Sequence, residues 1–142
     1  MARDIEDLLT EVTPFARNCA ESGVKDVGVI GVDSGWEIYV GGNGGIKTEV
    51  AQFLCKVKTR EEVLEYAGAF LQLYREEARY LDRTVHYVKR VGLDTIKKKV
   101  VEDAAHRKAL YARLKHALEG VPDPWKERAA GEDRREFEAL AV

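Results

Sequence analysis

The glycines of this 142-residue chain are concentrated in one short stretch, and this uneven distribution constrains the fold more than any other feature of the sequence. Eight of the twelve glycines fall between Gly23 and Gly45, and only four follow in the remaining 97 residues. Glycine weakens helices and permits tight turns and close backbone contacts. We therefore expect strands and turns in the first region and helices in the second.

The first region has the pattern of a β-hairpin. A β-branched run over residues 27–32 is followed by the turn-forming residues Asp33–Gly35, and apolar residues then alternate at positions 36, 38 and 40. This pattern predicts strands at about 26–32 and 36–41, joined as a hairpin. Because two strands alone are marginally stable in water, the hairpin requires a helix or another chain packed against it.

After residue 58 the pattern becomes helical. Thr59 and Glu62 form a capping box that begins a long helix, whose apolar face continues to Leu81. A shorter helix is expected from about Arg83 to Gly92. Another is expected from Asp94, its N-cap, to Gly120. The residues of the apolar face of the long helix are Val63, Ala67, Phe70, Leu71, Tyr74, Ala78 and Leu81.

The two ends of the chain carry apolar residues in a polar context. Residues 1–16 place apolar side chains at the i, i+3, i+4, i+7 spacing and acidic ones in the first turn, and Pro14 ends the run. This pattern predicts a short amphipathic leader helix that docks on another surface. In the polar tail from residue 123, the expected docking anchors are Trp125, Phe137 and Leu140.

Composition and charge exclude several classes of protein. The 23 basic and 25 acidic residues leave a net charge of −2, so no overall field attracts nucleic acid. No apolar run reaches the length of a membrane span. Two cysteines 36 positions apart provide no disulfide framework, which indicates a reducing, cytoplasmic environment.

The loop that contains Gly41, Gly42, Asn43 and Gly44 is a candidate binding segment. It is not a Walker A loop, because Ile46 occupies the position of the second glycine, whose small size lets backbone N–H groups close on phosphate. Four glycines around an asparagine do indicate that the backbone passes close to something bulky. Packed protein and a flat cofactor both satisfy this condition.

The two cysteines have different surroundings in the sequence. Cys19 follows Asn18, a good N-cap, and precedes Gly23, a good residue at a helix end, so it is expected in the first turn of a short helix. A thiolate is stabilised there and could bind a metal, although position alone favours a small buried side chain. Cys55 lies in an apolar stretch and is expected to be a core thiol. No histidine has the zinc-ligand spacing to a cysteine or to another histidine.

The segment that begins at Arg17 with "RNCAESGVKDVGVIGVDSGWEIYVGGNGG" and continues into the helical region resembles a known family. It is similar to the C-terminal part of the large subunits of bacterial NAD(P)H-dependent assimilatory nitrite reductases, within the sirohaem and [4Fe–4S] nitrite/sulfite reductase family. In that family four cysteines, spaced C-x5-C and C-x3-C, hold the cluster. The resemblance aligns Cys19 with the last of them, which also bridges to the sirohaem iron.

The resemblance also implies where this chain departs from the family. The C-x3-C partner of Cys19 falls on Phe15, with Ala16 in place of the usual proline. The glycine-rich loop from Gly41 to Gly45, which includes Asn43, resembles the family's segment that passes beside the sirohaem, which implies a cofactor-binding role for Gly41, Gly42, Asn43 and Gly44. The other ligands, and the domains that hold FAD and NAD(P)H, correspond to sequence upstream of this chain, and the parent enzyme also has a small subunit.

These considerations together predict an α+β fold: a short β-hairpin of a nitrite/sulfite reductase half-domain, followed by a mainly helical C-terminal region. The expected divisions are a leader (1–16), a half-domain fragment with the hairpin (17–58), and a helical region and tail (59–142). We expect a fragment of the reductase that binds no cofactor and is inactive alone. The alternative is a cofactor-free interaction module that retained the fold. In either case, unpaired strand edges and an uncovered apolar face predict a homodimer.

Overall fold

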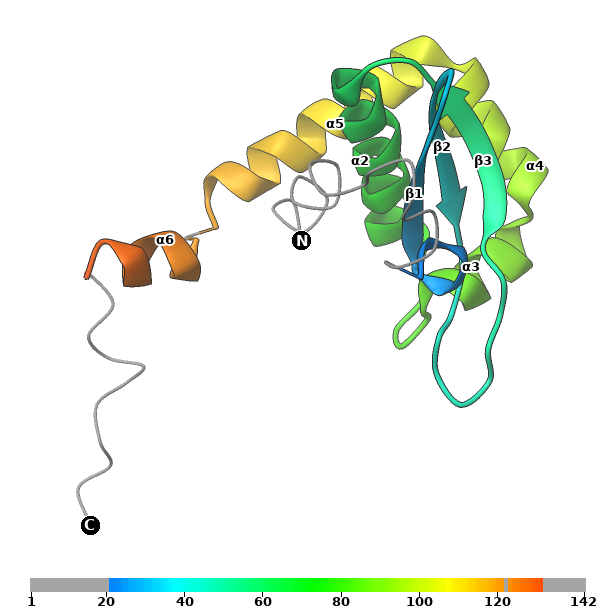
Figure 1. Cartoon of the computed structure of the whole chain (residues 1–142), viewed down its shortest axis with the longest axis horizontal. Coiled ribbons are helices and arrows are strands. Elements are labelled where there is room, and N and C mark those ends of the chain that lie inside the picture. Colours follow the sequence, from blue (N-terminus) through cyan, green and yellow to red (C-terminus); the bar gives the residue numbers. More distant parts are fainter. Residues whose placement is uncertain (1–20, 122, 132–142) are drawn as a thin grey trace.

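The computed structural model describes residues 21–121 and 123–131, and the expected leader helix lies outside these residues. A small antiparallel sheet packs against helices on one side, and a helical arm leads away from this body (Figure 1). The fold is α+β, as the sequence predicts. The elements are η1 (Ser22–Val24), β1 (Val27–Val32), β2 (Gly35–Val40), β3 (Gln52–Val57), α2 (Arg60–Glu77), α3 (Thr84–Val91), α4 (Leu93–Lys97), the π-helical turn η2 (Lys98–Glu102), α5 (Ala104–Glu119) and α6 (Pro124–Ala129).

The sheet has the order β1-β2-β3, with antiparallel pairing throughout. The predicted hairpin is confirmed, because β1 pairs with β2 over its whole length. The third strand was not predicted, and it lies next to β2 so that Ile38 pairs with Cys55. A shift in register between Ile38 and Tyr39 interrupts the regular alternation of side chains in this pair. The hairpin therefore obtains the support it requires from within the chain.

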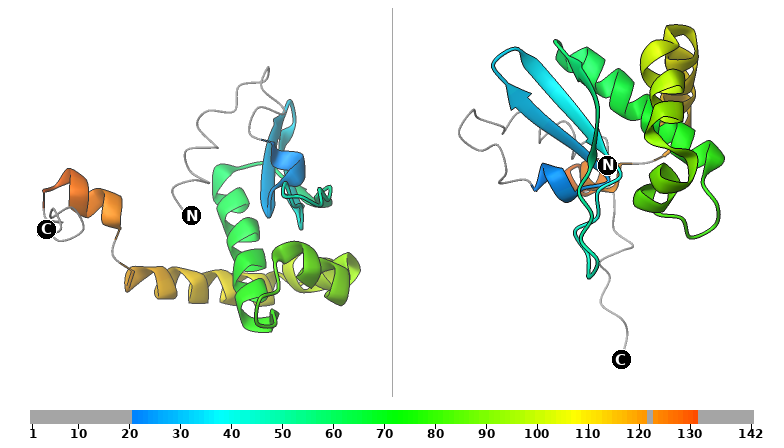
Figure 2. Two further views of the ribbon diagram at one scale, coloured as in Figure 1. Left: turned by 90° about the horizontal axis from the view of Figure 1, so that it is seen from below. Right: turned by 90° about the vertical axis from the view of Figure 1, so that its right-hand side faces the viewer.

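One face of the sheet forms the core with the helices. Strand residues such as Ile38 and Val40 are fully buried against Val63 and Phe70 of α2 and Tyr87 of α3. The side views in Figure 2 show the helices gathered on this one side of the strands. Burial of these side chains stabilises the fold by roughly 1.5–3 kcal/mol each relative to leaving them exposed. The sheet thus has one buried face and one face that carries polar groups such as Glu37 and Lys56.

Helix α2 begins as predicted and ends earlier than predicted. The amide of Glu62 donates to Thr59 Oγ1 at 3.2 Å and the amide of Thr59 donates to Glu62 Oε2 at 3.2 Å, so the capping box is confirmed. The expectation that its apolar face continues to Leu81 is wrong, because the helix ends at Glu77 and Leu81 is 80% exposed. The chain turns where the Asp82 carboxylate accepts the amide proton of Arg79, at 3.3 Å.

The following helical region is confirmed in its first part and divided in its second. Helix α3 ends before Gly92, which has a φ of 88°, as predicted. The expected single helix from Asp94 to Gly120 is wrong. Asp94 lies inside α4, and α5 begins at Ala104 after its N-cap Asp103, whose carboxylate accepts from the amide of His106 at 2.8 Å.

The break between η2 and α5 is stabilised by Arg107, which is the one buried charged residue among those that the structure describes. Its guanidinium donates to the carbonyl of Val100 at 3.1 Å and that of Val101 at 2.9 Å, and it pairs with Glu65 of α2 at 2.7 Å. These bonds satisfy carbonyls that the interrupted helix leaves without partners. Apolar periodicity continues through the break, so it could not reveal this feature.

Candidate functional site

The loop between β2 and β3 is an ordered structure that projects from one end of the molecule (Figure 1). Asn43 and Glu49 form a backbone bridge, with N···O distances of 2.9 and 2.8 Å. The side-chain amide of Asn43 also donates to the carbonyl of Lys47 at 2.7 Å. The predicted site residues Gly41, Gly42, Asn43 and Gly44 therefore lie on the first side of a closed loop with a defined shape.

The base of this loop, Gly41 and Gly42, is buried against protein. A Cβ added to Gly42 would lie 2.6 Å from the carbonyl oxygen of Lys25, and one added to Gly41 would lie 2.9 Å from Val88 Cγ2. Gly41 also has a φ of 75°, which favours glycine. For these two residues, the bulky neighbour inferred from the sequence is packed protein.

The outer part of the loop has room. Gly44 and Gly45 are exposed, and the nearest atoms to a Cβ added there are 3.6 and 3.5 Å away. Asn43 is partly buried. Of the four residues that the sequence identifies as cofactor-binding, only Asn43 and Gly44 lie where a flat group could approach without displacing protein.

Charged groups attach the loop to α3. Lys89 Nζ lies 2.6 Å from Glu49 Oε1, and Lys47 Nζ lies 3.8 Å from the same oxygen. The hydrogen bond from Lys89 holds the pKa of the Glu49 carboxyl below its usual range. Close by, the Asp26 carboxylate accepts from Arg83 at 3.0 Å and from the Thr84 hydroxyl. The sequence could not reveal this contact, because the partners are more than fifty residues apart.

The chain enters the described region next to this site. Ser22 is buried, and its hydroxyl donates to the carbonyl of Val29 in β1 at 3.2 Å. A Cβ on Gly28 would lie 2.0 Å from the Ser22 carbonyl oxygen, so only glycine allows η1 to pack on the strand. Gly23 was expected to follow a short helix, but it lies in the middle of η1, which corrects that expectation. Cys19 and Phe15 lie outside the described residues.

The residues of this chain do not fit a complete [4Fe–4S] cluster. Such a cluster takes four cysteine thiolates, and the sequence has two cysteines. Cys55 is 7% exposed in β3, so the predicted core position of this thiol is confirmed. Burial raises the pKa of the thiol to about 11, so it stays protonated. Among residues 21–121 and 123–131, no group of three or more histidine, cysteine or acidic side chains could hold a metal ion.

The histidines of the described region have local partners or lie on helix surfaces. His86 Nδ1 accepts from the amide of Arg83 at 3.4 Å, and His116 Nδ1 lies 3.4 Å from the Glu119 carboxylate. No helix in the part of the chain that the structure describes is both long and apolar enough to cross a membrane.

Comparison with known proteins identifies the family. Residues 10–108 match the model of the nitrite and sulphite reductase 4Fe-4S domain. The chain is 53% identical over 116 residues to the NAD(P)H nitrite reductase of Bacillus subtilis (strain 168) and 34% identical over 113 residues to the large subunit of the NADH nitrite reductase of Escherichia coli (strain K12). These matches cover 82% and 75% of this chain but only 14% and 13% of the two relatives.

A third relative is named as a sulfite reductase. The assimilatory-type sulfite reductase of Nitratidesulfovibrio vulgaris (strain Hildenborough) is 30% identical over 88 residues, which is 62% of this chain and 39% of that protein. The family match covers more than half of the chain and includes the sheet, the β2–β3 loop and helices α2 to α4. The chain therefore belongs to the nitrite and sulphite reductase 4Fe-4S domain family.

Proposed function

We propose that this chain is the C-terminal part of the large subunit of a sirohaem nitrite reductase, and that it does not catalyse the reaction alone. The observation that carries the proposal is the 53% identity to an NAD(P)H nitrite reductase over 82% of this chain, in a sequence with only two cysteines. In the parent enzyme, nitrite would be reduced by six electrons to ammonium. NAD(P)H would supply the electrons through FAD, the cluster and the sirohaem.

In this proposal the chain contributes one ligand and one cofactor-facing loop. Cys19 corresponds to the cysteine that links cluster and sirohaem, and its own thiolate would be the single cluster ligand that this chain provides. Asn43 and Gly44 would lie beside the sirohaem. The packing of Gly41 and Gly42 against Val88 and the backbone at Lys25 would hold that part of the loop in place.

The remaining ligands and electron carriers would come from other polypeptide. We propose that upstream domains of the same subunit, and a small subunit, are the partners in the parent enzyme, in the cytoplasm. The relatives are about seven times longer than the matched region, which supports the assignment of these ligands and carriers to other parts of the enzyme. No contact with nucleic acid is expected, since the net charge is −2.

The second candidate is a cofactor-free interaction module that retained the fold. Two observations favour it. Gly41 and Gly42 are required by contacts within the protein, so two of the four glycines in the loop are explained without a cofactor. In addition, the resemblance to the family places Phe15 at a ligand position, and an aromatic side chain suits packing better than metal binding.

The first test is reconstitution of the full chain under anaerobic conditions with iron, sulfide and sirohaem. Its readouts are the ultraviolet–visible spectrum and an assay of bound iron and sulfide. We expect no stoichiometric cluster or haem signal, because a cubane cluster needs four cysteine ligands and the alignment with the family gives this chain only one. A stoichiometric signal would overturn the proposed inactivity and show that Cys19 recruits ligands from a second chain or an external thiol.

A chimaera separates the two candidates. Residues 17–142 would replace the corresponding C-terminal part of the Bacillus subtilis enzyme, with that protein's own sequence before them. A reductase fragment predicts bound sirohaem and cluster in this chimaera, loss of the cluster with Cys19→Ser, and retention of it with the control Cys55→Ser. A chimaera that folds but binds neither cofactor would contradict the reductase proposal and support the module.

A further inference from the structure

The face of the sheet that points away from the core, which we call the outer face, carries aromatic and aliphatic side chains. Val29 and Ile38 pair with each other and are buried on the inner face, so the next residues along the strands point outward. A sheet face in water more commonly carries polar residues. The apolar and aromatic residues of the outer face are Ile30, Val32, Tyr39 and Phe53.

These side chains form one continuous surface across the strands. The ring of Tyr39 in β2 meets the ring of Phe53 in β3 edge to face, with 5.6 Å between their centroids. Ile30 of β1 lies opposite Glu37 of β2, whose carboxylate accepts the Tyr39 hydroxyl proton at 2.9 Å. The outer face therefore offers connected apolar surface on all three strands, and not isolated side chains.

Two lysines border the aromatic pair. Lys97 Nζ of α4 lies 5.5 Å from the centroid of the Phe53 ring. Lys56 lies on the outer face of β3, opposite Glu37, and its ammonium donates to the Ser34 hydroxyl. Among the residues that the structure describes, no ion pair includes either lysine. This surface suits a partner that combines apolar and acidic side chains.

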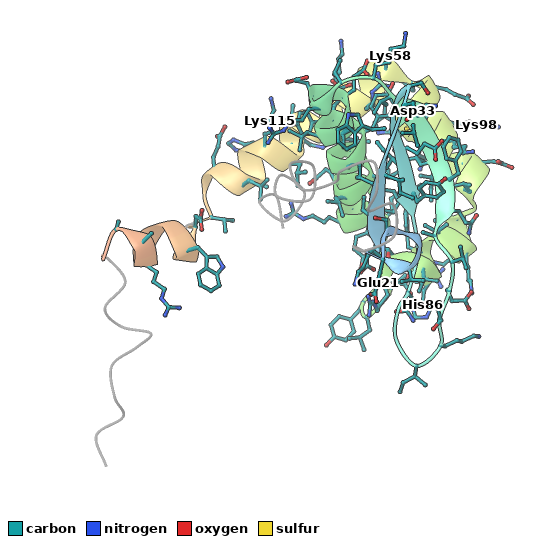
Figure 3. The ribbon with its side chains drawn as sticks, in the orientation of Figure 1. Glu21, Asp33, Lys58, His86, Lys98 and Lys115 are labelled. Carbon is teal, nitrogen blue, oxygen red and sulfur yellow. The ribbon has the colours of Figure 1, made fainter. Side chains whose placement is uncertain are left out.

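The chain enters the described region on this same face. Gly28 pairs with Tyr39, so a Cβ added to it would point outward, where it would lie 2.0 Å from the Ser22 carbonyl oxygen. The backbone at Ser22 thus lies directly on the outer face. Figure 3 labels Glu21 at one end of the sheet and Asp33, in the β1–β2 turn, at the other. A segment that precedes Glu21 therefore starts at one end of the outer face.

The leader, residues 1–16, has the composition that this face requires, and it lies outside the described residues. A helix over residues 4–13 would be about 15 Å long, which fits the length of about 20 Å of a six-residue strand. The link of residues 14–21 spans at most about 28 Å, enough to return along the strands. The apolar residues of the leader, at the spacing of one helix side, are Ile5, Leu8, Leu9 and Val12, and its acidic residues are Asp4, Glu6, Asp7 and Glu11.

We propose that residues 4–13 form a helix that packs on the outer face of the same chain. Its apolar side covers the Tyr39–Phe53 pair, and its acidic residues lie near Lys56 and Lys97. An isolated helix of this length is marginal in water, so the helix depends on the surface that it covers. The proposal is independent of any cofactor and of the proposed reductase function.

The other large exposed apolar side chains do not offer a comparable surface. They are divided between the β2–β3 loop, the α2–α3 loop and the helical arm, with Ile46, Tyr80 and Trp125 as examples. The left-hand view of Figure 2 sets these three parts of the molecule apart. The apolar side of a helix needs neighbouring contacts along its length, which the paired strands of the outer face provide.

Paramagnetic relaxation enhancement on the full chain tests the position of the leader. A spin label on Thr10→Cys, in a Cys19→Ser background, would lie on the polar side of the proposed helix. The same background without the cysteine at position 10 shows that buried Cys55 takes up no label. We expect the amide signal of Tyr39 to lose at least twofold more intensity than that of Phe70, which lies in α2 beyond the inner face.

Two variants of the leader sharpen this measurement. Leu8→Asp/Leu9→Asp should remove the difference between the two signals, because it places charges on the apolar side of the helix. The matched control Leu8→Met/Leu9→Met keeps apolar side chains of similar volume and should preserve the difference. Neither pair alters the described fold, which unchanged amide shifts in α2 would verify. Equal losses at Tyr39 and Phe70 in the labelled wild-type leader would overturn the proposal.

A mixed sample separates the chain's own leader from that of a second copy. Spin-labelled chains without isotope would be mixed in equal amounts with unlabelled chains that carry nitrogen-15. We expect no difference between the Tyr39 and Phe70 signals in this mixture. A twofold difference there would overturn the proposed packing within one chain, and would show that a second copy supplies the leader, as in the homodimer predicted from the sequence.

The proposed charge contacts have their own test. Lys56→Glu/Lys97→Glu should reduce the difference between the Tyr39 and Phe70 signals, and should do so more strongly at low ionic strength. The matched control is Lys108→Glu/Lys115→Glu, which makes the same change of charge on exposed positions of α5. An equal reduction by both pairs, or no reduction by either, would contradict the assigned contact with Lys56 and Lys97.

Discussion

The base and the outer part of the β2–β3 loop use the same amino acid for different reasons. Gly41 and Gly42 are buried where a Cβ would come within 3.0 Å of neighbouring protein atoms. Gly44 and Gly45, only a few residues further along, are exposed and meet no atom closer than 3.5 Å at that position. A glycine-rich run can thus combine two kinds of glycine. Some are required by the packing of the fold, and others leave a surface free for a ligand or partner.

The largest expected effect is at the base of the loop. Gly42→Ala places a methyl group against the backbone of Val24 and Lys25, which cannot move aside as a side chain can. We expect a loss of about 2–3 kcal/mol in the free energy of unfolding, typical of overpacking, measured by urea denaturation. Gly44→Ala is the matched control and should stay within about 0.5 kcal/mol of wild type. Equal losses for the two variants would remove the distinction between base and outer loop.

The next effect concerns the support beneath the base. Asp26→Ala removes the acceptor for Arg83 and the Thr84 hydroxyl, which join the start of β1 to the start of α3. The expected loss is about 1–2 kcal/mol, since the groups are partly exposed. Thr84→Val should cost a similar amount, and the double variant should cost less than the sum because both remove one interaction. Additive losses would show that the two groups do not act together.

A smaller effect is expected further along the loop. Asn43→Ala removes the bond from its side chain to the Lys47 carbonyl, in an exposed position. We expect a loss below about 1 kcal/mol together with faster hydrogen exchange of the Glu49 amide, which binds the Asn43 carbonyl. Thr48→Val is the control. It removes only the long bond of 3.4 Å from the Thr48 hydroxyl to the Gly45 carbonyl, so it should leave the exchange of the Glu49 amide unchanged. Unchanged exchange at Glu49 would indicate that the backbone bridge alone closes the loop.

The smallest effect is the response of the loop to pH. Because the hydrogen bond from Lys89 lowers the pKa of Glu49 in the folded chain, the attachment is fully present above the ordinary glutamate pKa near 4.5. It is lost as the pH falls through the lower, folded-state value. An NMR titration of the Glu49 carboxyl carbon should show this shift, and Lys89→Met should return the pKa towards its ordinary range. A pKa that Lys89→Met leaves unchanged would contradict the assigned cause.

Features encoded by neighbouring residues were predictable from the sequence. The turn Asp33–Gly35 indicated the hairpin, Thr59 and Glu62 indicated the start of α2, and Gly92 indicated the end of α3. In each case the determining hydrogen bond or backbone angle involves residues within a few positions of one another. Such local patterns can be recognised in the sequence without knowledge of the rest of the fold.

Features encoded by distant contacts were missed. The third strand has an irregular pairing next to Tyr39, so its side chains do not alternate regularly. The break at Asp103 is stabilised by Arg107 through carbonyls and through Glu65, which lies on another helix. Periodicity cannot register either feature, because it describes only which residues are apolar along the chain and not which groups meet across it.

The candidate site shows the same division. The sequence by itself determined the fold class, the glycine-rich loop, and the family that residues 10–108 match. The tertiary structure alone decided that Gly41 and Gly42 serve the fold, that Cys55 is buried in the core, and that Lys89 and Arg90 bind carboxylates on two different loops. The physical reason is that local bonding is set by residues a few positions apart, whereas burial and the meeting of charges depend on residues that only folding brings together.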